Sequence, residues 1–220
     1  MVGADDDDVV IGCVSLFSGG GFGDIGVQYG AAVPVLAACE LLPERAALLR
    51  RLFPRAAVVE GDIWNVKEGL VETVRERIGA RRPWLMLMSP PCQGMSSNGA
   101  GRISNAIARG LRPDMDPRNR LILPAIEVVE RLRPEWVVLE NVRGMQHTVI
   151  MNEDGVLERI LDVLRRRLPD YSFQERVLDA ADFGVPQHRE RLITIGKRRA
   201  ATTVVQCGDG GALRGRCWRP

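Results

Sequence analysis

The sequence predicts an α/β fold in which a mostly parallel β-sheet carries helices on both faces. Short apolar runs rich in β-branched residues alternate with amphipathic segments from residue 9 to about residue 199. A glycine-rich turn at residues 18–23 follows the first run, which is a common start for the first helix of such a fold. The last two apolar runs have no helical segment between them, so we expect one of these strands to be antiparallel to the rest.

The first half of the chain supplies four of the expected strands. We place them at residues 9–17, 33–39, 57–60 and 84–88, each an apolar run of strand length. A short helix is expected between the glycine-rich turn and Gly30. Helical periodicity predicts further helices at residues 43–52, which begin with a proline, and at residues 66–78.

The second half continues the alternation after a long polar segment. Residues 93–118 are rich in Gly, Ser, Asn and Arg without an apolar period, and so long a loop within a domain is usually functional or disordered. Helices are expected at residues 119–132 and 155–168, and strands at 135–139, 172–178 and 192–196. We therefore predict one domain over residues 1–199 and an irregular tail over residues 200–220.

Composition predicts a soluble protein of the cytoplasm. Hydrophobic residues make up 45% of the chain and charged residues 26%, and a net charge of +2 is too small to indicate nucleic-acid binding by itself. Five irregularly spaced cysteines form neither a disulfide framework nor a zinc pattern, so we expect a reducing compartment and no metal. The acidic start is not a signal peptide, and no apolar run is long enough to span a membrane.

Features at three consecutive strand ends point to an adenosine-type ligand. The glycines around Gly19 lie between a strand and a helix, where they let the backbone approach a ligand, and no Lys-Ser/Thr pair follows to make a triphosphate loop. Glu40 ends the second strand about 20 residues later, where an acidic residue accepts hydrogen bonds from ribose hydroxyls. Asp62 follows the third strand, where it could receive an adenine amino group. Each feature alone also fits a tight turn, a solvated strand end or a helix cap.

Cys92 and Glu140 are candidates for covalent catalysis. Cys92 follows Pro90 and Pro91, which can continue neither a strand nor a helix and would deliver the thiol to the carboxyl edge of the sheet. Glu140 ends the next strand, so we expect both groups in one crevice, where a thiol and a carboxyl suit covalent catalysis with proton assistance. Alone, the cysteine would fit an inert buried thiol and the carboxylate an ion-pair partner.

An alternating charged segment precedes the last strand. If this segment is extended, Gln187, Arg189 and Arg191 share one face, and arginine offers fixed donors to phosphate and carbonyl oxygens. His188 would then point the other way and be structural. A solvated strand edge is the ordinary alternative for such a segment.

Together these residues resemble the cytosine-5 DNA methyltransferases of the bacterial modification type. The resemblance covers about residues 10–199 in the family's motif order: FSGGGFGDIG, the acidic strand end at Glu40, GDI, PPCQ, ENV and QHRER. It implies a Rossmann-like class I methyltransferase fold with S-adenosylmethionine as the cofactor. The chain departs from the family at Phe22, where a second glycine usually follows Gly21, and this departure bears on the shape of the turn.

The resemblance also assigns roles to individual residues. The implied cofactor pocket comprises Phe17, Gly19, Gly21, Glu40, Asp62, Ile63 and Pro91. The implied catalytic residues are Cys92, Glu140, Arg189 and Arg191. The residues implied to lie nearest the DNA are Gln93, Ser96 and Gln187.

The mechanism implied by the resemblance acts on a cytosine flipped out of double-stranded DNA, which would bring the protein to the nucleoid. Attack of the Cys92 thiolate on carbon 6 makes carbon 5 reactive toward a methyl group. Glu140, with a pKa raised by burial, would stabilise charge at N3. Arg191 would hold the exocyclic oxygen, and Arg189 would position the surroundings of Cys92 or a phosphate. The polar segment 93–118 would close over the base.

The family normally carries a target-recognition region and a last motif after the QxRxR strand, and too few residues follow Arg199 here for both. We therefore expect a truncated product or the catalytic half of a split enzyme, with recognition on a second polypeptide and weak activity alone. An inactive fragment that binds cofactor or DNA, and a tRNA cytosine-5 methyltransferase, remain alternatives. A nicotinamide oxidoreductase would leave Cys92, Glu140 and the arginine pair unexplained.

Overall fold

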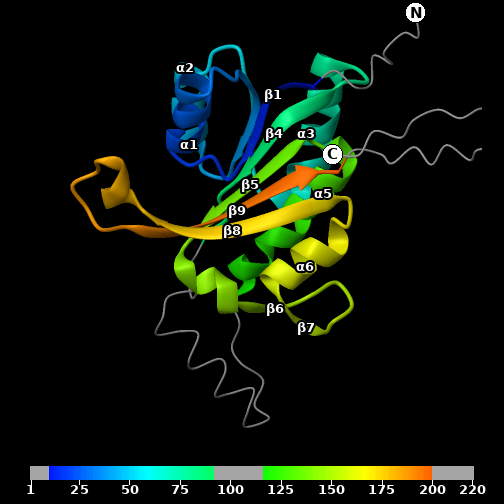
Figure 1. Cartoon of the computed structure of the whole chain (residues 1–220). Coiled ribbons are helices and arrows are strands. Elements are labelled where there is room, and N and C mark those ends of the chain that lie inside the picture. Colours follow the sequence, from blue (N-terminus) through cyan, green and yellow to red (C-terminus); the bar gives the residue numbers. More distant parts are fainter. Residues whose placement is uncertain (1–9, 92–115, 200–220) are drawn as a thin grey trace, which may run out of the picture.

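A seven-stranded sheet organises the chain in a computed structural model, which describes residues 10–91 and 116–199 (Figure 1). Cys92, Gln93 and Ser96 lie outside the described residues, as do most of the polar segment 93–118 and the tail over residues 200–220.

The sheet is mostly parallel, as the sequence predicts. Its strands, in spatial order, are β3 (Ala57–Glu60), β2 (Val35–Glu40), β1 (Val10–Leu16), β4 (Arg82–Met88), β5 (Trp136–Asn141), β9 (Glu190–Arg198) and β8 (Tyr171–Asp179). The first five are parallel to one another, whereas β9 is antiparallel to both β5 and β8. One strand, β9, thus runs against the other six, which confirms the expected antiparallel strand near the end of the chain.

Helices cover both faces of this sheet (Figure 1). One face carries α1 (Phe22–Ile25) and α2 (Pro43–Leu52), and the other carries α3 (Ile63–Ile78), α5 (Ile122–Leu132) and α6 (Ile160–Arg167). Short helical turns connect them: η2 (Gly26–Gly30), η3 (Pro117–Leu121), η4 (Arg143–His147) and η5 (Ala180–Phe183). Within the described ranges, no helix has both the length and the apolar character needed to cross a membrane.

The two-residue periodicity of the strands divides the buried side chains between two cores. On β2, Ala37 and Cys39 pack into the larger core with α3, α5 and α6, whereas Ala38 packs with Leu49 and Phe53 near α2. Alternate side chains point to opposite faces of a strand, so an apolar run with polar ends becomes a strand buried on both sides. Function is thereby left to the strand ends.

A β-hairpin occupies part of the segment in which the sequence predicts one helix over residues 155–168. Strands β6 (Val149–Met151) and β7 (Leu157–Arg159) pair as a separate antiparallel sheet, and α6 begins only at Ile160. The Asn152 side chain accepts hydrogen bonds from the amides of Asp154 and Val156, and Gly155 takes a φ of 74°. Local side-chain bonds of this kind compete with helix formation, which explains why the prediction was wrong here.

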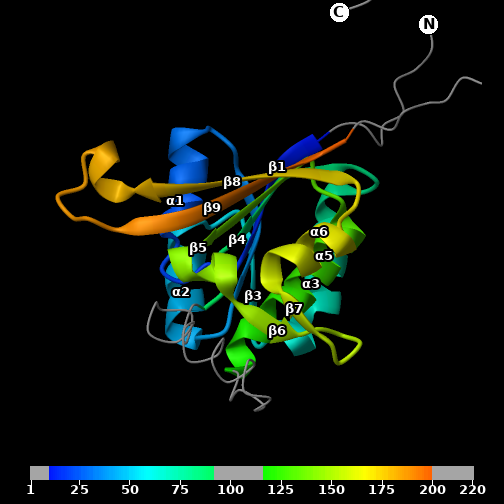
Figure 2. The ribbon, with the colours of Figure 1, turned by 60° about the horizontal axis from the view of Figure 1, so that its bottom comes forward.

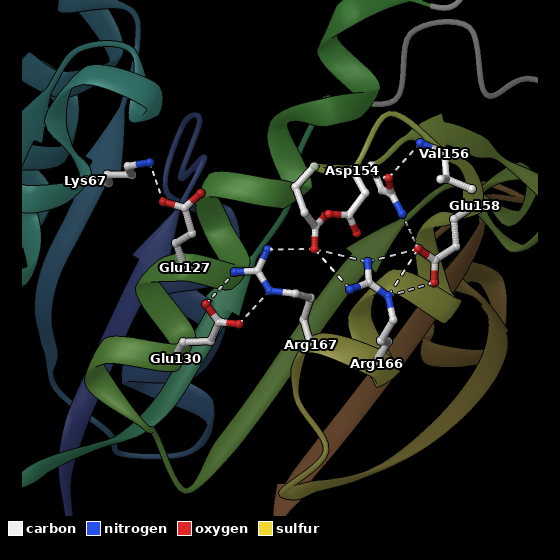
Figure 3. A network of polar contacts seen from close by, with 10 residues as sticks. Lys67, Glu127, Glu130, Asp154, Val156, Glu158, Arg166 and Arg167 are labelled. Atoms are coloured by element: carbon white, nitrogen blue, oxygen red, sulfur yellow. Dashed lines mark hydrogen bonds and ion pairs between the residues drawn. The ribbon is translucent and has the colours of Figure 1, made fainter.

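Two arginines of α6 tie this hairpin to the neighbouring helix (Figure 3). Arg166 contacts Glu153 and Glu158 of the hairpin, at 3.1 and 3.0 Å. Arg167 donates two hydrogen bonds to Glu130 of α5, at 2.7 and 2.5 Å, and reaches Glu153 at 3.4 Å. Bidentate ion pairs that are joined in a network fix the relative position of the elements they connect better than isolated surface pairs do. The hairpin is therefore fixed on the face of the sheet that carries α3, α5 and α6, opposite α1 and α2.

Another predicted boundary shifts for a local reason. The sequence places the start of the second amphipathic helix at residue 66, whereas α3 begins at Ile63. Asp62 caps this helix, because its carboxylate accepts a hydrogen bond from the Trp64 amide at 3.0 Å. Capping residues stabilise the first turn regardless of its apolar periodicity.

We expect Gly196→Ala to destabilise the sheet by about 1–3 kcal/mol, since overpacking a filled position costs that much. A Cβ at Gly196 would lie 2.4 Å from the Phe173 ring on the neighbouring strand β8. As a control, Gly69→Ala on α3 meets no atom within 4 Å, and should stabilise by about 0.5–1 kcal/mol. Urea unfolding measures both values, and equal effects of the two substitutions would contradict this account of β8–β9 packing.

Candidate functional site

The parallel register brings the predicted site segments to one edge of the sheet. Leu16, the last residue of β1, pairs with Cys39 on β2 and with Met88 on β4. Met88 in turn pairs with Leu139 on β5. The glycine-rich turn, Glu40, the Pro90-Pro91 segment and Glu140 therefore all leave from the carboxyl edge, where open α/β sheets keep their ligands. The first residues of β9 lie at the same edge, because Leu192 pairs with Asn141.

The glycine-rich turn has a strained backbone. Phe17 has a φ of 58° and Gly19 a φ of 57°, both in the left-handed region. Hydrogen bonds hold the turn: the Ser18 amide donates to the Cys39 carbonyl at 3.2 Å, and the Gly21 amide donates to the Ser18 carbonyl at 2.9 Å. A non-glycine residue such as Phe17 is rarely found with positive φ, and such strain concentrates at functional sites.

The two glycines assigned to the cofactor pocket differ in their surroundings. A Cβ at Gly19 would meet only a backbone oxygen at 4.0 Å, so the space beside it is open. A Cβ at Gly21 would lie 3.0 Å from Leu49 and 3.1 Å from Phe53 of the α2 region. Gly19 thus permits close approach of a ligand, whereas Gly21 permits close packing of the turn against α2.

Phe22, the departure from the family pattern, fits the turn without strain. Gly21 takes the left-handed conformation at the N-cap with a φ of 80°, and α1 begins at Phe22. The Phe22 side chain is 85% exposed. Because the ring points outward, a second glycine is not needed at this position.

Glu40 joins the first two strands through its carboxylate. Its Oε2 accepts a hydrogen bond from the Gly19 amide at 2.8 Å, and its Oε1 accepts one from the Leu42 amide at 3.1 Å. The residue is 5% exposed, and Arg45 lies 3.9 Å away. Each carboxylate oxygen has two acceptor sites, so both can still accept a hydroxyl. These two acceptor oxygens therefore fit the hydroxyl groups of a ribose beside the open face of Gly19.

Beyond the end of β3, the three residues at the start of α3 differ in exposure. Asp62 is exposed, but Ile63 is only 3% exposed and packs into the larger core. Trp64 is 38% exposed, and Leu41, next to Glu40, is 58% exposed. Neither Leu41 nor Trp64 is among the residues that the sequence pattern predicts for the site. The available signal for Leu41 was an apolar residue directly after the acidic strand end at Glu40. Exposed apolar surface beside carboxylates fits a flat ring such as adenine.

The segment that leads to Cys92 is fixed to the neighbouring strands. The Asn141 side chain donates a hydrogen bond to the Pro90 carbonyl at 2.9 Å, and its Oδ1 accepts one from the Val142 amide at 2.8 Å. The Ser89 amide also donates to the Leu16 carbonyl at 3.2 Å. Asn141 is 2% exposed, so both bonds are shielded from water. Pro91 therefore leaves the sheet at a defined place beside Glu140.

Glu140 and Arg191 form an ion pair at this edge. Arg191 Nε lies 2.9 Å from Glu140 Oε1, and the two side chains are 22% and 35% exposed, respectively. Arg191 Nη1 donates to the Glu190 carbonyl at 2.7 Å. The deep burial expected for Glu140 is not found: its side chain is 35% exposed, and Trp136 and Val138, on the same face of β5, are also only partly buried. The structure does bring together two of the four predicted catalytic residues.

Gln187 and Arg189 lie in the loop before β9, which begins only at Glu190. The predicted shared face with Arg191 therefore does not arise from one extended strand. This loop extends beyond the sheet (Figure 2), and Phe183 and Val185 on it are 69% and 45% exposed. Both Gln187 and Arg189 are exposed, as a DNA contact requires.

Asp179 fixes this loop at its base. Its carboxylate accepts hydrogen bonds from the amides of Arg189 at 2.8 Å and Ala181 at 3.1 Å, and His188 Nδ1 lies 2.8 Å from it. These hydrogen bonds lower the pKa of Asp179 to about 2, and the one with His188 has the largest effect. Asp179 in turn raises the pKa of His188. His188 contacts Asp179 through Nδ1, although its side chain is 91% exposed.

No group of three or more His, Cys, Asp and Glu residues that could hold a metal occurs within residues 10–91 and 116–199. The two cysteines described there, Cys13 and Cys39, are buried free thiols. Burial raises the pKa of Cys39 to about 12 and that of Cys13 still further, so neither supplies a reactive thiolate.

Comparison with known proteins gives a consistent result. The sequence profile of C-5 cytosine-specific DNA methylases matches residues 11–207. The Type II methyltransferase M.AquIA of Picosynechococcus sp. is 33% identical over 86% of this chain and 73% of its own length. The Type II methyltransferase M1.HgaI of Avibacterium volantium is 31% identical over 82% of this chain but only 48% of its own.

Solved structures share the fold. The Dnmt2 methyltransferase of S. pombe superposes with a TM-score of 0.60 at 20% identity, covering 87% of this chain and 51% of that one. A DNMT2 variant from Spodoptera frugiperda superposes with a TM-score of 0.61 at 20% identity, covering 91% and 54%. The chain thus spans about half the length of these structures and of M1.HgaI.

The Asp179–His188 contact makes a prediction about pH. The pKa of His188 is raised in the folded protein, so its stabilising contribution is complete below the unfolded pKa and is lost as pH rises through the folded value. The pKa of Asp179 is lowered to about 2, so its contribution is present above the unfolded value and is lost as pH falls through about 2. NMR titration of the His188 ring should give a lower pKa in Asp179→Asn. The His147 signal, as the reference, should be the same in both proteins, and an unchanged His188 would contradict the assigned contact.

Proposed function

Because the chain belongs to the C-5 cytosine-specific DNA methylase family, we propose that it transfers a methyl group from S-adenosylmethionine to carbon 5 of cytosine in DNA. The main structural support for the proposal, besides family membership, is that the two candidate sites lie at the same edge of the sheet. The Glu40–Gly19 contact, the Asn141-anchored Pro90 segment and the Glu140–Arg191 pair all lie at one edge of the sheet. A cofactor site and a base site would thus be neighbours, as a direct transfer between two ligands requires.

S-adenosylmethionine, when bound, supplies the methyl group as an activated sulfonium. Glu40 would accept hydrogen bonds from its ribose hydroxyls, and the open face of Gly19 would let the backbone approach. Asp62 would receive the adenine amino group, with Leu41 and Trp64 as the apolar surface for the ring. Phe17, Gly21, Ile63 and Pro91 complete the proposed pocket, with Gly21 and Ile63 acting through packing.

Catalysis in this proposal begins at Cys92, whose thiolate attacks carbon 6 of the flipped cytosine. Glu140 uses Oε1 for Arg191, and no other contact from the described residues engages its Oε2. In this proposal Oε2 carries the proton that N3 of the base takes up as Cys92 adds to carbon 6. Arg191 bonds to Glu140 and Glu190 through Nε and Nη1, and no contact made among the described residues uses its Nη2, which would serve the exocyclic oxygen. Carbon 5 would then take the methyl group, and the sulfonium sulfur would leave as a neutral thioether. Loss of the carbon 5 proton to solvent, return of the N3 proton to Glu140 and expulsion of the Cys92 thiolate would restore the aromatic ring.

DNA contacts would come from the β8–β9 loop and from the segment after Cys92. Gln187 and Arg189 are exposed on the loop, where an arginine can reach a phosphate. Gln93 and Ser96 are assigned to the DNA by their place after the PPCQ motif.

We expect Cys92→Ser to abolish covalent trapping on DNA that contains 5-fluorocytosine in the presence of S-adenosylmethionine, because fluorine at carbon 5 blocks release of the enzyme. A gel-shifted adduct is the readout, and Cys207→Ser is the matched control, which should still form it. Duplex DNA and tRNA substrates are run in parallel. An adduct on tRNA alone would overturn the DNA assignment, and none on either substrate, even with a candidate partner chain, would favour the inactive fragment.

We expect Glu40→Ala to weaken S-adenosylmethionine binding about 10- to 100-fold, since hydrogen bonds to charged groups contribute about 1.5–3 kcal/mol. The substitution removes the ribose acceptor and also the acceptor of the Gly19 and Leu42 amides. Calorimetric titration measures the affinity. Glu44→Ala, an exposed residue in the first turn of α2, should leave it unchanged, and equal losses in both variants would contradict the role of Glu40.

A further inference from the structure

Arg189, on the loop between β8 and β9, carries a guanidinium that the described residues do not use. The residue is exposed. No hydrogen bond or ion pair with residues 10–91 or 116–199 engages its side chain, whereas Arg191, two residues later, pairs with Glu140 at 2.9 Å. A long side chain loses rotamer freedom when it binds a partner, so its value for binding depends on how firmly its backbone is held.

The backbone of Arg189 is held at both of its polar groups. Its amide donates a hydrogen bond to Asp179 Oδ1 at 2.8 Å, and its carbonyl accepts one from the Ala180 amide at 3.2 Å. Asp179 and Glu190 form the last pair of the β8–β9 ladder. Arg189 is therefore fixed at the point where the loop rejoins the sheet.

One carboxylate joins the two limbs of this loop. Asp179 Oδ1 also accepts a hydrogen bond from the Ala181 amide at 3.1 Å, and His188 Nδ1 lies 2.8 Å from Oδ2. The outgoing limb at Ala181 and the returning limb at His188 and Arg189 thus meet at one side chain. These bonds lower the pKa of Asp179 to about 2, so the acceptor is ionised at neutral pH, and hydrogen bonds to an ionised acceptor are stronger than those between neutral groups.

The hydrogen bonds at the tip of the loop do not reach Arg189. The Val185 amide donates to the Ala180 carbonyl at 3.2 Å, and the Gln187 amide donates to the Val185 carbonyl at 2.7 Å. These bonds join backbone groups and require no particular side chain. Among the described residues, Asp179 is the one whose side chain bonds to the backbone of Arg189. The position of Arg189 therefore depends on this carboxylate more than on the rest of the loop.

We propose that Asp179 is a positioning residue, which holds the backbone of Arg189 so that its guanidinium projects from the loop toward a phosphate of the DNA. Arginine suits a phosphate because its donors are fixed in a fork. A negative charge beside such a contact would by itself repel DNA, so a carboxylate at this place needs a role that outweighs the repulsion. The role toward DNA rests on the proposed function, whereas the hold on the Arg189 backbone does not.

Amide hydrogen exchange in the full chain without ligands tests the hold on Arg189. Asp179→Ala should speed exchange at the Arg189 and Ala181 amides about tenfold, because both lose their acceptor. Asp179→Asn keeps an oxygen for both amides and should retain most of the protection. Asp182→Ala, which removes an exposed carboxylate from the same loop, is the matched control and should leave both amides unchanged.

Fluorescence anisotropy with a labelled DNA duplex of mixed sequence tests the role toward DNA. Asp179→Ala should weaken binding about fivefold, the upper range for one exposed ion pair, and so should Arg189→Ala. The double variant should bind no more weakly than Arg189→Ala, since both changes remove one interaction. Removal of a negative charge alone strengthens attraction to DNA, so Asp182→Ala and Asp179→Asn should bind at least as tightly as the original chain.

The outcomes separate this proposal from the proposed function. Unaltered exchange at Arg189 in Asp179→Ala would overturn it, as would an Asp179→Asn variant as impaired as Asp179→Ala. Tighter duplex binding by Asp179→Ala, equal to that of Asp182→Ala, would show that the carboxylate only repels DNA, and would overturn the positioning role with the proposed function left intact. If the original chain binds no duplex, the proposed function and the role toward DNA both fail, and the hold of Asp179 on Arg189 stands or falls with the exchange pattern.

Discussion

The site depends on the direction and register of the parallel strands. Because Leu16, Cys39, Met88 and Leu139 are held level with one another, four separate chain segments leave the sheet at one edge. The interiors of β1 and β2 are buried on both faces, so their chemistry is left to the strand ends. A shift of one residue in any strand would turn its buried set outward and withdraw its terminal residue from the edge. Core packing and site geometry are therefore set by the same pairing.

Two buried side chains turn this alignment into fixed geometry. Glu40 holds the Gly19 amide, which joins the turn after β1 to the end of β2. Asn141 holds the Pro90 carbonyl, which joins the segment after β4 to the end of β5. In each case a side chain at one strand end bonds to the backbone after the adjacent strand, so the loops do not depend on their own sequence for position. Shielding from water strengthens both contacts.

Local patterns account for what the sequence could predict. The sequence predicted the bounds of most strands and of α2 to within a few residues. Apolar runs, a helix-starting proline such as Pro43 and turn glycines each signal the structure of the segment in which they occur. The β6–β7 hairpin was missed because the Asn152 side-chain bonds overrule a helical pattern. The Glu140–Arg191 pair depends on a contact between distant segments, and no spacing along the chain encodes it. The roles of Cys92, Gln93 and Ser96 rest on their motif alone.

The Glu140–Arg191 pair also bears on how a base could enter. In the folded chain each group is the partner of the other, so neither is an unpaired charge in a half-buried site. A partly exposed pair of this kind contributes only about 0–1 kcal/mol, since water competes for both groups. A base that offers an acceptor oxygen to Arg191 can therefore replace the contact at small cost, and a proton taken up by Glu140 would then be donated to the ring nitrogen. The pair keeps both side chains aimed at the edge of the sheet, and its weakness leaves them available.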